Sequence, residues 1–135
     1  MVPRIRALTP LLQVFSMSQS LTFYCDVLGF SILATSSAEL EPDWVMLQRD
    51  DSTLMLNTAY ERDKRPPEPE SARIASHGDT ALFFRCDDTD AVYAHLKSVD
   101  WPAREPFTTS YGMRQVYTKD PDGFEICFQH PAPPP

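Results

Sequence analysis

The chain has little of what several common functions require. Its 135 residues include only four glycines, and they form no glycine-rich loop that could hold a phosphate. Its three cysteines, Cys25, Cys86 and Cys127, form no CxxC pair, and their odd number predicts reduced thiols in a cytoplasmic setting. No apolar run is long enough to cross a membrane and no signal peptide is recognisable, so we expect neither membrane insertion nor export.

Positive charge is also scarce. Twelve lysines and arginines stand against 19 aspartates and glutamates, for a formal net charge of −7. Nucleic acids need a basic footprint to neutralise their phosphates, so we expect no nucleic-acid partner. The acidic balance is compatible with a cationic ligand, and it is also common in soluble proteins that bind none. The length and a hydrophobic content of 42% predict one domain with a substantial core.

The most informative stretch runs from 111 to 129 and reads as strand, turn and strand. The segment 115–119 is rich in β-formers, and Asp120-Pro121-Asp122-Gly123 has the residues of a tight turn. After it, Phe124, Ile126 and Phe128 alternate with Glu125, Cys127 and Gln129. This period of two predicts a strand with an apolar face under a helix and a mixed face that can line a cavity.

The rest of the chain predicts two similar halves. The first half has strands at 8–15, 30–35, 44–48 and 53–57 and a helix at 18–28. The second has strands at 80–86 and 103–107, a helix at about 89–99, and the hairpin. Between them, residues 59–78 have charges of both signs and three prolines, which predicts a linker or mobile loop. The proline-rich end from 131 to 135 is expected to be frayed.

The halves match at a shift of 72 residues. This shift carries Leu12, Val14, Leu54 and Leu56 onto Phe84, Cys86, Ile126 and Phe128. One half alone cannot bury both faces of a sheet, so the pattern predicts a duplicated unit that pairs with itself.

Two segments carry a family resemblance: LTPLLQVFSMSQSLTFYCDVLGF near the start and YTKDPDGFEICFQ near the end. Together they resemble the glyoxalase/bleomycin resistance/dioxygenase group, the vicinal oxygen chelate (VOC) superfamily. The resemblance implies an α+β fold in which two tandem βαβββ modules form a curved mixed sheet around a central cavity. It implies a single VOC domain over 1–135, with modules at about 8–58 and 79–130 and a linker at about 59–78. It also implies a homodimer, with modules paired within a chain or across two.

The resemblance also tests for metal chemistry. The superfamily's enzymes hold a divalent ion with His, Glu or Gln from four strand positions, which align here with Thr9, Met55, Ala81 and Cys127. None of these is a carboxylate or imidazole donor, so we expect no metal, no cofactor and no catalytic residue of the usual kind. The three histidines, His77, His95 and His130, are expected on the surface or in loops.

Strand alternation then assigns the cavity wall. The predicted ligand-binding residues are Phe15, Trp44, Met46, Gln48, Met55, Asn57, Phe83, Arg85, Tyr111, Arg114 and Cys127, with Tyr111 and Arg114 near its mouth. An aromatic and thioether-rich wall with a few amides suits a small planar or amphipathic molecule, aromatic or cationic. The same side chains could instead fill the space or form a dimer interface. Cys127 could be a nucleophile, but a small buried hydrophobic residue is the simpler interpretation.

Three functional hypotheses follow. The first is a metal-free protein that sequesters a small molecule, as bleomycin-resistance proteins do, with antibiotic resistance as the outcome. The second is a lyase, isomerase or dioxygenase of the same fold, with displaced metal ligands or a metal-independent mechanism. The third is a non-catalytic accessory or regulatory dimer.

Overall fold

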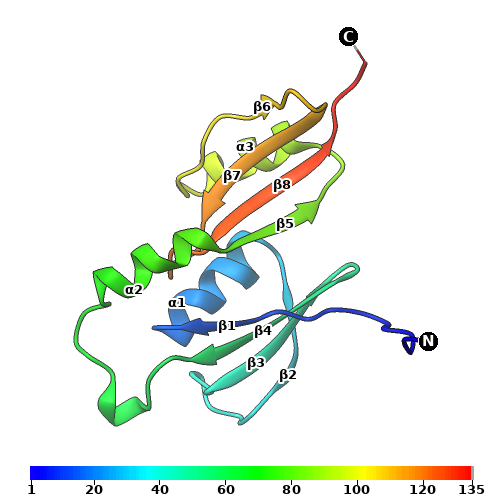
Figure 1. Ribbon diagram of the computed structural model, residues 1–135. Helices are drawn as coiled ribbons and strands as arrows, with labels where there is room; N and C mark the ends of the chain where they lie inside the picture. Colours follow the sequence, from blue (N-terminus) through cyan, green and yellow to red (C-terminus); the bar gives the residue numbers. More distant parts are fainter. Residues whose placement is uncertain (135) are drawn as a thin grey trace. The chain divides into compact units, whose positions relative to one another are not determined.

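The computed structural model describes residues 1–134 as two compact units, Met1–Arg65 and a second that begins at Pro66. Each unit contains one four-stranded mixed sheet (Figure 1). The strand orders are β1-β4-β3-β2 and β5-β8-β7-β6, and in both sheets the first strand runs parallel to the last strand of its unit. The predicted α+β fold with two βαβββ modules is confirmed.

The strand register repeats at the predicted shift. Leu12 lies opposite Leu56 in the first sheet, and Phe84 lies opposite Phe128 in the second, 72 residues further along. Both pairs belong to the face against which the helices of their own unit pack. The two halves therefore share their apolar positions and also the pairing of the strands that bear them.

The first unit builds its core around an unusual helix. Its elements are β1 Leu11–Val14, α1 Met17–Leu21, η1 Thr22–Val27, β2 Ser31–Thr35, β3 Trp44–Arg49, β4 Ser52–Thr58 and η2 Arg62–Lys64. The hydroxyl of Ser16 accepts a hydrogen bond from Gln19 N and caps α1. The helix then widens into the π-helix η1, in which Leu28 N donates to Phe23 O. This widening buries Phe23 beside Tyr24, which a regular 3.6-residue repeat does not predict.

The second unit has the elements α2 Ser71–Ser76, η3 His77–Asp79, β5 Ala81–Arg85, α3 Thr89–Ser98, β6 Phe107–Thr108, β7 Met113–Lys119 and β8 Glu125–Pro131. Helix α3 begins at its cap Asp88, whose carboxylate accepts from Ala91 N, and it contacts β7 and β8. The hairpin turn is as predicted: Gly123 N donates to Asp120 O, and Gly123 has a φ of +86°.

Two segments differ from their predictions. The segment 59–78, predicted as a linker or mobile loop, contains η2 and α2 and the start of η3. Helix α2 forms because the prolines end at 69 and the residues that follow pack on the β7–β8 turn. The predicted strand at 103–107 is reduced to an isolated bridge at Ala103 and the short β6. Pro102 precedes this segment and Pro106 lies within it, and both limit its pairing because proline has no N–H for a ladder.

The C-terminal end is more ordered than predicted. Strand β8 continues through His130 to Pro131, and Ala132 N donates to Gly112 O at 2.8 Å. The indole N–H of Trp101 donates to Lys119 O at 3.0 Å. Within residues 1–134, no helix combines the length and apolar character needed to cross a membrane.

Candidate ligand-binding faces

Each sheet has one face packed by the helices of its own unit and an opposite face, which we call its open face. In the first sheet, Leu12, Val14, Val45, Leu47, Leu54 and Leu56 are buried on the helix-packed side. Their neighbours in each strand point to the other side and are partly or fully exposed. The open-face side chains of the first sheet are therefore available to a ligand or to another protein surface.

The first open face carries six of the predicted site residues. Register places Trp44 opposite Asn57 and Met46 opposite Met55, while Gln48 lies opposite Thr53. Leu11 and Gln13 of β1 belong to the same face, with Leu11 44% exposed and Asn57 Nδ2 donating to Gln13 Oε1 at 3.4 Å. Phe15 follows at the end of β1 and contacts Tyr60 edge-on.

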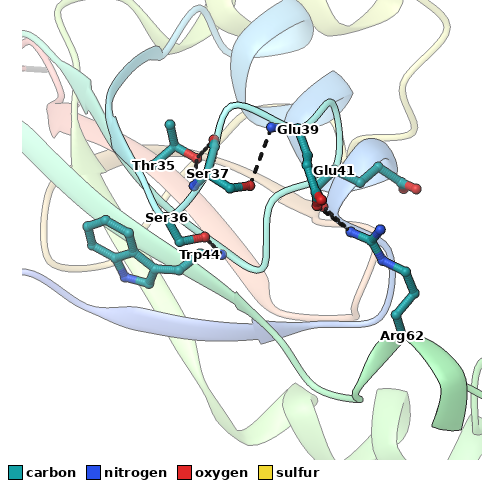
Figure 2. Close-up of polar contacts among 7 residues, drawn as sticks. All are labelled: Thr35, Ser36, Ser37, Glu39, Glu41, Trp44 and Arg62. Carbon is teal, nitrogen blue, oxygen red and sulfur yellow. Dashed lines mark hydrogen bonds and ion pairs between the residues drawn. The ribbon is translucent and has the colours of Figure 1, made fainter.

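A polar network holds the β2–β3 loop at the edge of this face (Figure 2). Trp44 N donates to Ser36 Oγ at 3.2 Å, which fixes the start of β3. Arg62 Nη2 donates to Glu39 Oε2 at 2.9 Å and to Glu41 O at 3.0 Å (Figure 2). Arg62 therefore ties the segment after β4 to the loop before β3 and fixes the position at which Trp44 enters the sheet.

Next to this loop is a small hollow within the first unit. It is lined by Phe15, Met17, Glu41, Asp43, Thr58, Tyr60, Arg62 and Arg65. The guanidinium of Arg65 lies 5.3 Å above the ring of Phe15. The cavity volume is about 40 Å³, far below the roughly 300–1,000 Å³ of sites that enclose a drug-sized molecule. The hollow alone does not explain binding of an aromatic compound.

The second open face is aromatic. Phe83 is 51% exposed, and its ring meets that of Tyr117 edge-on at 6.1 Å. Tyr117 stacks in turn on Phe107, with ring centres 6.0 Å apart and planes at 12°. Arg104 lies over both stacked rings, with Cζ 5.4 Å from the centre of Phe107 and 5.6 Å from that of Tyr117.

Only Phe83 of this cluster was among the predicted ligand-binding residues. Tyr117 alternates with the buried Val116 and Thr118, so the strand pattern could have placed it on the open face. Arg104 comes from an irregular segment and Phe107 begins the two-residue β6, so alternation gives no direction for either side chain. A hydrogen bond from Arg104 N to Tyr117 O at 2.9 Å holds this segment against β7, and no sequence pattern predicts that bond.

Buried amides lie beside the aromatic cluster. Gln115 is 1% exposed, and its Nε2 donates to Gln129 Oε1 at 2.9 Å and to the hydroxyl of Tyr111 at 3.2 Å. Tyr111 itself, a predicted site residue, is mostly exposed at the turn before β7. The amide pair is satisfied within the protein, so it forms a fixed polar patch beside the rings.

Cys127 is fully buried on this face, opposite Tyr117 in the sheet. Burial raises the pKa of its thiol, and nearby Glu125 and Cys86 add to the effect, while a hydrogen bond with Tyr117 opposes it. Burial, together with Cys127, raises the pKa of Tyr117 to about 12. Both groups therefore remain protonated at neutral pH, which favours the small-hydrophobe interpretation of Cys127 over the nucleophile.

The two predicted arginines are on opposite faces. Arg85 is exposed and alternates with Ala81 and Phe83, so it lies on the open face. Arg114 is in β7, on the helix-packed face, where its Nη2 lies 2.9 Å from Asp90 Oδ1 of α3. Arg114 was expected near the cavity mouth with Tyr111, and it lies within β7, which begins two residues earlier than expected.

The family model of the glyoxalase/bleomycin resistance protein/dioxygenase superfamily matches residues 5–128. The chain belongs to this superfamily. It is 30% identical over 119 residues to the uncharacterized protein YaeR of Escherichia coli (strain K12), a match that spans 79% of this chain and 81% of YaeR.

Solved structures share the superfamily fold at lower identity. TnmS3, an antibiotic binding protein from Streptomyces sp. CB03234, aligns with a TM-score of 0.70 and 23% identity, over 98% of this chain and 100% of TnmS3. Lactoylglutathione lyase from Agrobacterium tumefaciens aligns with a TM-score of 0.68 and 20% identity, over 94% of each chain. The same fold thus supports a binding protein and an enzyme. At these sequence identities, the shared fold does not show which of the two functions this superfamily member has.

The superfamily's metal does not fit the four aligned positions. Thr9 Oγ1 is engaged with Thr53 Oγ1 at 2.7 Å, and Ala81 has no donor atom. Met55 offers a thioether, and the buried thiol of Cys127 has a raised pKa. A divalent ion prefers carboxylate or imidazole ligands. Across residues 1–134, no three His, Cys, Asp or Glu side chains gather in a group that could hold an ion.

Proposed function

We propose that this superfamily member binds a small planar aromatic molecule on its open faces and sequesters it without metal chemistry. The observation that carries the proposal is the cluster of Phe83, Phe107 and Tyr117 beside the Gln115–Gln129 amide pair. Aromatic side chains with a few fixed polar groups are typical of small-molecule sites. TnmS3, which shares the fold, is described as an antibiotic binding protein, so an antibiotic is one candidate ligand.

We also propose that the protein acts as a homodimer in a reducing, cytoplasmic setting. Ile32 and Leu33 are 52% and 56% exposed on β2, the edge strand of the first sheet. A register shift between Ile32 and Ala34 marks a bulge there. Exposed apolar side chains on an edge strand favour an interface. A second copy of the chain is a suitable partner, and light scattering on wild type and Leu33→Lys tests it: a lower mass for the variant supports the dimer.

The binding proposal is tested on chelator-treated protein by thermal shift and by anisotropy of a fluorescent arene. Phe83→Ala removes an exposed ring of the cluster, while Leu40→Ala removes a fully exposed side chain from the β2–β3 loop as the control. We expect the arene to raise the melting temperature of wild type and of Leu40→Ala, and to bind Phe83→Ala about tenfold more weakly. Equal binding by both variants contradicts a site at this cluster.

The same samples test the enzyme alternative. Mn, Ni, Zn and Fe(II) ions are added one at a time to chelator-treated protein, and bound metal is counted after gel filtration. One tightly bound ion per chain, together with turnover of a glutathione conjugate, contradicts the proposal and favours an enzyme with displaced ligands. Stabilisation by neither ions nor arenes favours the accessory-dimer hypothesis.

A further inference from the structure

We infer that the second open face selects a planar aromatic acid, an arene bearing a carboxylate or similar anion, over a neutral or cationic arene. This inference rests on the proposed binding function and specifies its ligand. The proposed function requires only an aromatic surface. The inference adds two arginines, Arg85 and Arg104, that present unpaired positive charge beside that surface.

The arginines of the second unit divide by face. Arg73 and Arg114 each lie 2.9 Å from a carboxylate oxygen, of Asp122 and Asp90 respectively. Arg85 and Arg104 have no carboxylate within 4.0 Å among residues 1–134, and Glu105, which follows Arg104, forms no ion pair with it. The unit thus pairs its arginines away from the open face and leaves both open-face arginines without an internal anion.

The position of Arg104 suits an arene that carries an anion. Its guanidinium lies over Tyr117 and Phe107, and Tyr117 in turn meets the exposed ring of Phe83 edge-on. A flat ligand that packs against Phe83 brings a substituent on its ring toward this guanidinium. A guanidinium presents a planar fork of N–H donors that matches the two oxygens of a carboxylate. An ammonium ligand in the same place would meet like charge.

The local charge opposes the charge of the whole molecule. Strands β5, β7 and β8 place Arg85, Lys119 and Glu125 on this face, and Arg104 lies over its rings. Lys119 and Glu125 are register partners, so they offset each other. The two arginines remain, in a chain whose formal net charge is −7. Net charge therefore points to a cationic ligand, but the residues that a ligand would touch here favour an anion.

The test uses three probes with one ring system: anthracene-2-carboxylate, its primary amide and 2-(aminomethyl)anthracene. Fluorescence anisotropy gives a dissociation constant for each with the full chain at low and at moderate salt. We expect the acid to bind about tenfold tighter than the amide, and the amine to bind weakest, with the advantage of the acid falling as salt rises. Circular dichroism verifies that each variant is folded.

Three variants assign the preference. Arg104→Met keeps a long side chain over the rings and removes the charge. Arg85→Met removes the charge of the other open-face arginine and keeps a side chain of similar length. Arg114→Met removes an arginine of the helix-packed face and is the matched control. We expect the first two to bring the acid toward the affinity of the amide while amide binding persists, and the control to keep the tenfold preference.

The outcomes separate this inference from the function on which it rests. Similar affinity for all three probes, or an acid preference that survives in Arg104→Met and Arg85→Met, overturns the anionic selectivity and leaves aromatic binding intact. Failure of every probe to bind overturns the proposed function itself. Light scattering on the same samples measures whether the protein dimerises. If probe binding disappears as the protein dimerises, a second copy occupies this face and the inference fails.

Discussion

Arg73 Nη1 lies 2.9 Å from Asp122 Oδ1 and joins helix α2 to the turn between β7 and β8. The Asp122 side chain is only 2% exposed and that of Arg73 17%, so this ion pair is largely shielded from water. His77 reinforces the junction, with Nδ1 2.7 Å from Asp122 O and its ring stacked 3.9 Å from that of Phe124. The turn thus anchors the segment that the sequence predicts to be a loose linker.

The first prediction concerns this pair. Arg73→Met leaves the carboxylate of Asp122 buried without its counter-charge, and breaking a buried pair in this way costs about 3 kcal/mol. Urea unfolding measures the loss. Arg114→Met is the control, because its partner Asp90 is 61% exposed and water can replace the lost contact. Equal stability losses for the two variants contradict a structural role for the Arg73–Asp122 pair.

Two glycines give a matched second prediction. Gly112 and Gly123 have φ values of +84° and +86°, so alanine is strained at both. At Gly112 an added Cβ meets nothing within 4 Å, whereas at Gly123 it lies 2.6 Å from the backbone oxygen of Ile74. Gly112→Ala therefore shows the conformational cost alone, about 1 kcal/mol. Gly123→Ala adds a clash that only movement of α2 can relieve.

We expect Gly123→Ala to lose about 3 kcal/mol in all. Because the clash moves α2, hydrogen exchange at residues of this helix should speed up in Gly123→Ala and stay unchanged in Gly112→Ala. Equal stability losses for the two variants contradict this prediction. They mean that only the positive φ is costly and that the close approach of Ile74 does not affect stability.

The sequence predicted the features that depend on the alternation of residues along a strand and on the residues of a turn. Alternation placed Trp44, Met46 and Phe83 on open faces, and the DPDG turn formed where Pro121 and Gly123 required it. Contacts between segments distant in sequence could not be read in this way. Helix α2 is short and has no side-chain cap, and its docking on Asp122 and Gly123 is a tertiary effect. The same holds for Arg104, which reaches the rings from an irregular segment.

The start of β7 accounts for the position of Arg114. A strand expected at 115 begins at Met113, so Arg114 joins the ladder opposite His130 and alternates with the open-face Gln115. The sequence carries no clear signal for where this strand starts, because Gly112 is compatible with a start at 113 or at 115. One residue of alternation is enough to move a side chain to the other face of a sheet.

The third prediction concerns thiol chemistry. Burial raises the pKa of Cys25, Cys86 and Cys127 alike, with Asp26 adding to the effect at Cys25. A raised pKa lowers the thiolate fraction at pH 8, so a disulfide reagent should modify the folded protein slowly and label three thiols rapidly in denaturant. Cys127 should react last, since it is fully buried. Rapid labelling of Cys127, shown by its loss in Cys127→Ala, would restore the nucleophile hypothesis.

The last prediction follows from the phenol of Tyr117, whose pKa is raised to about 12 by burial and by Cys127 beside it. Between pH 10 and 12 the unfolded chain releases this proton while the folded chain retains it, so rising pH favours unfolding. The contribution of Tyr117 to stability is complete below pH 10 and decreases by at most about 2 kcal/mol as the pH approaches 12. Urea unfolding at pH 8, 10 and 11 measures the decrease.

Tyr117→Phe is the reference for that measurement, because every other group titrates in both proteins and only the difference between them belongs to this phenol. Parallel loss of stability in wild type and variant contradicts the raised pKa.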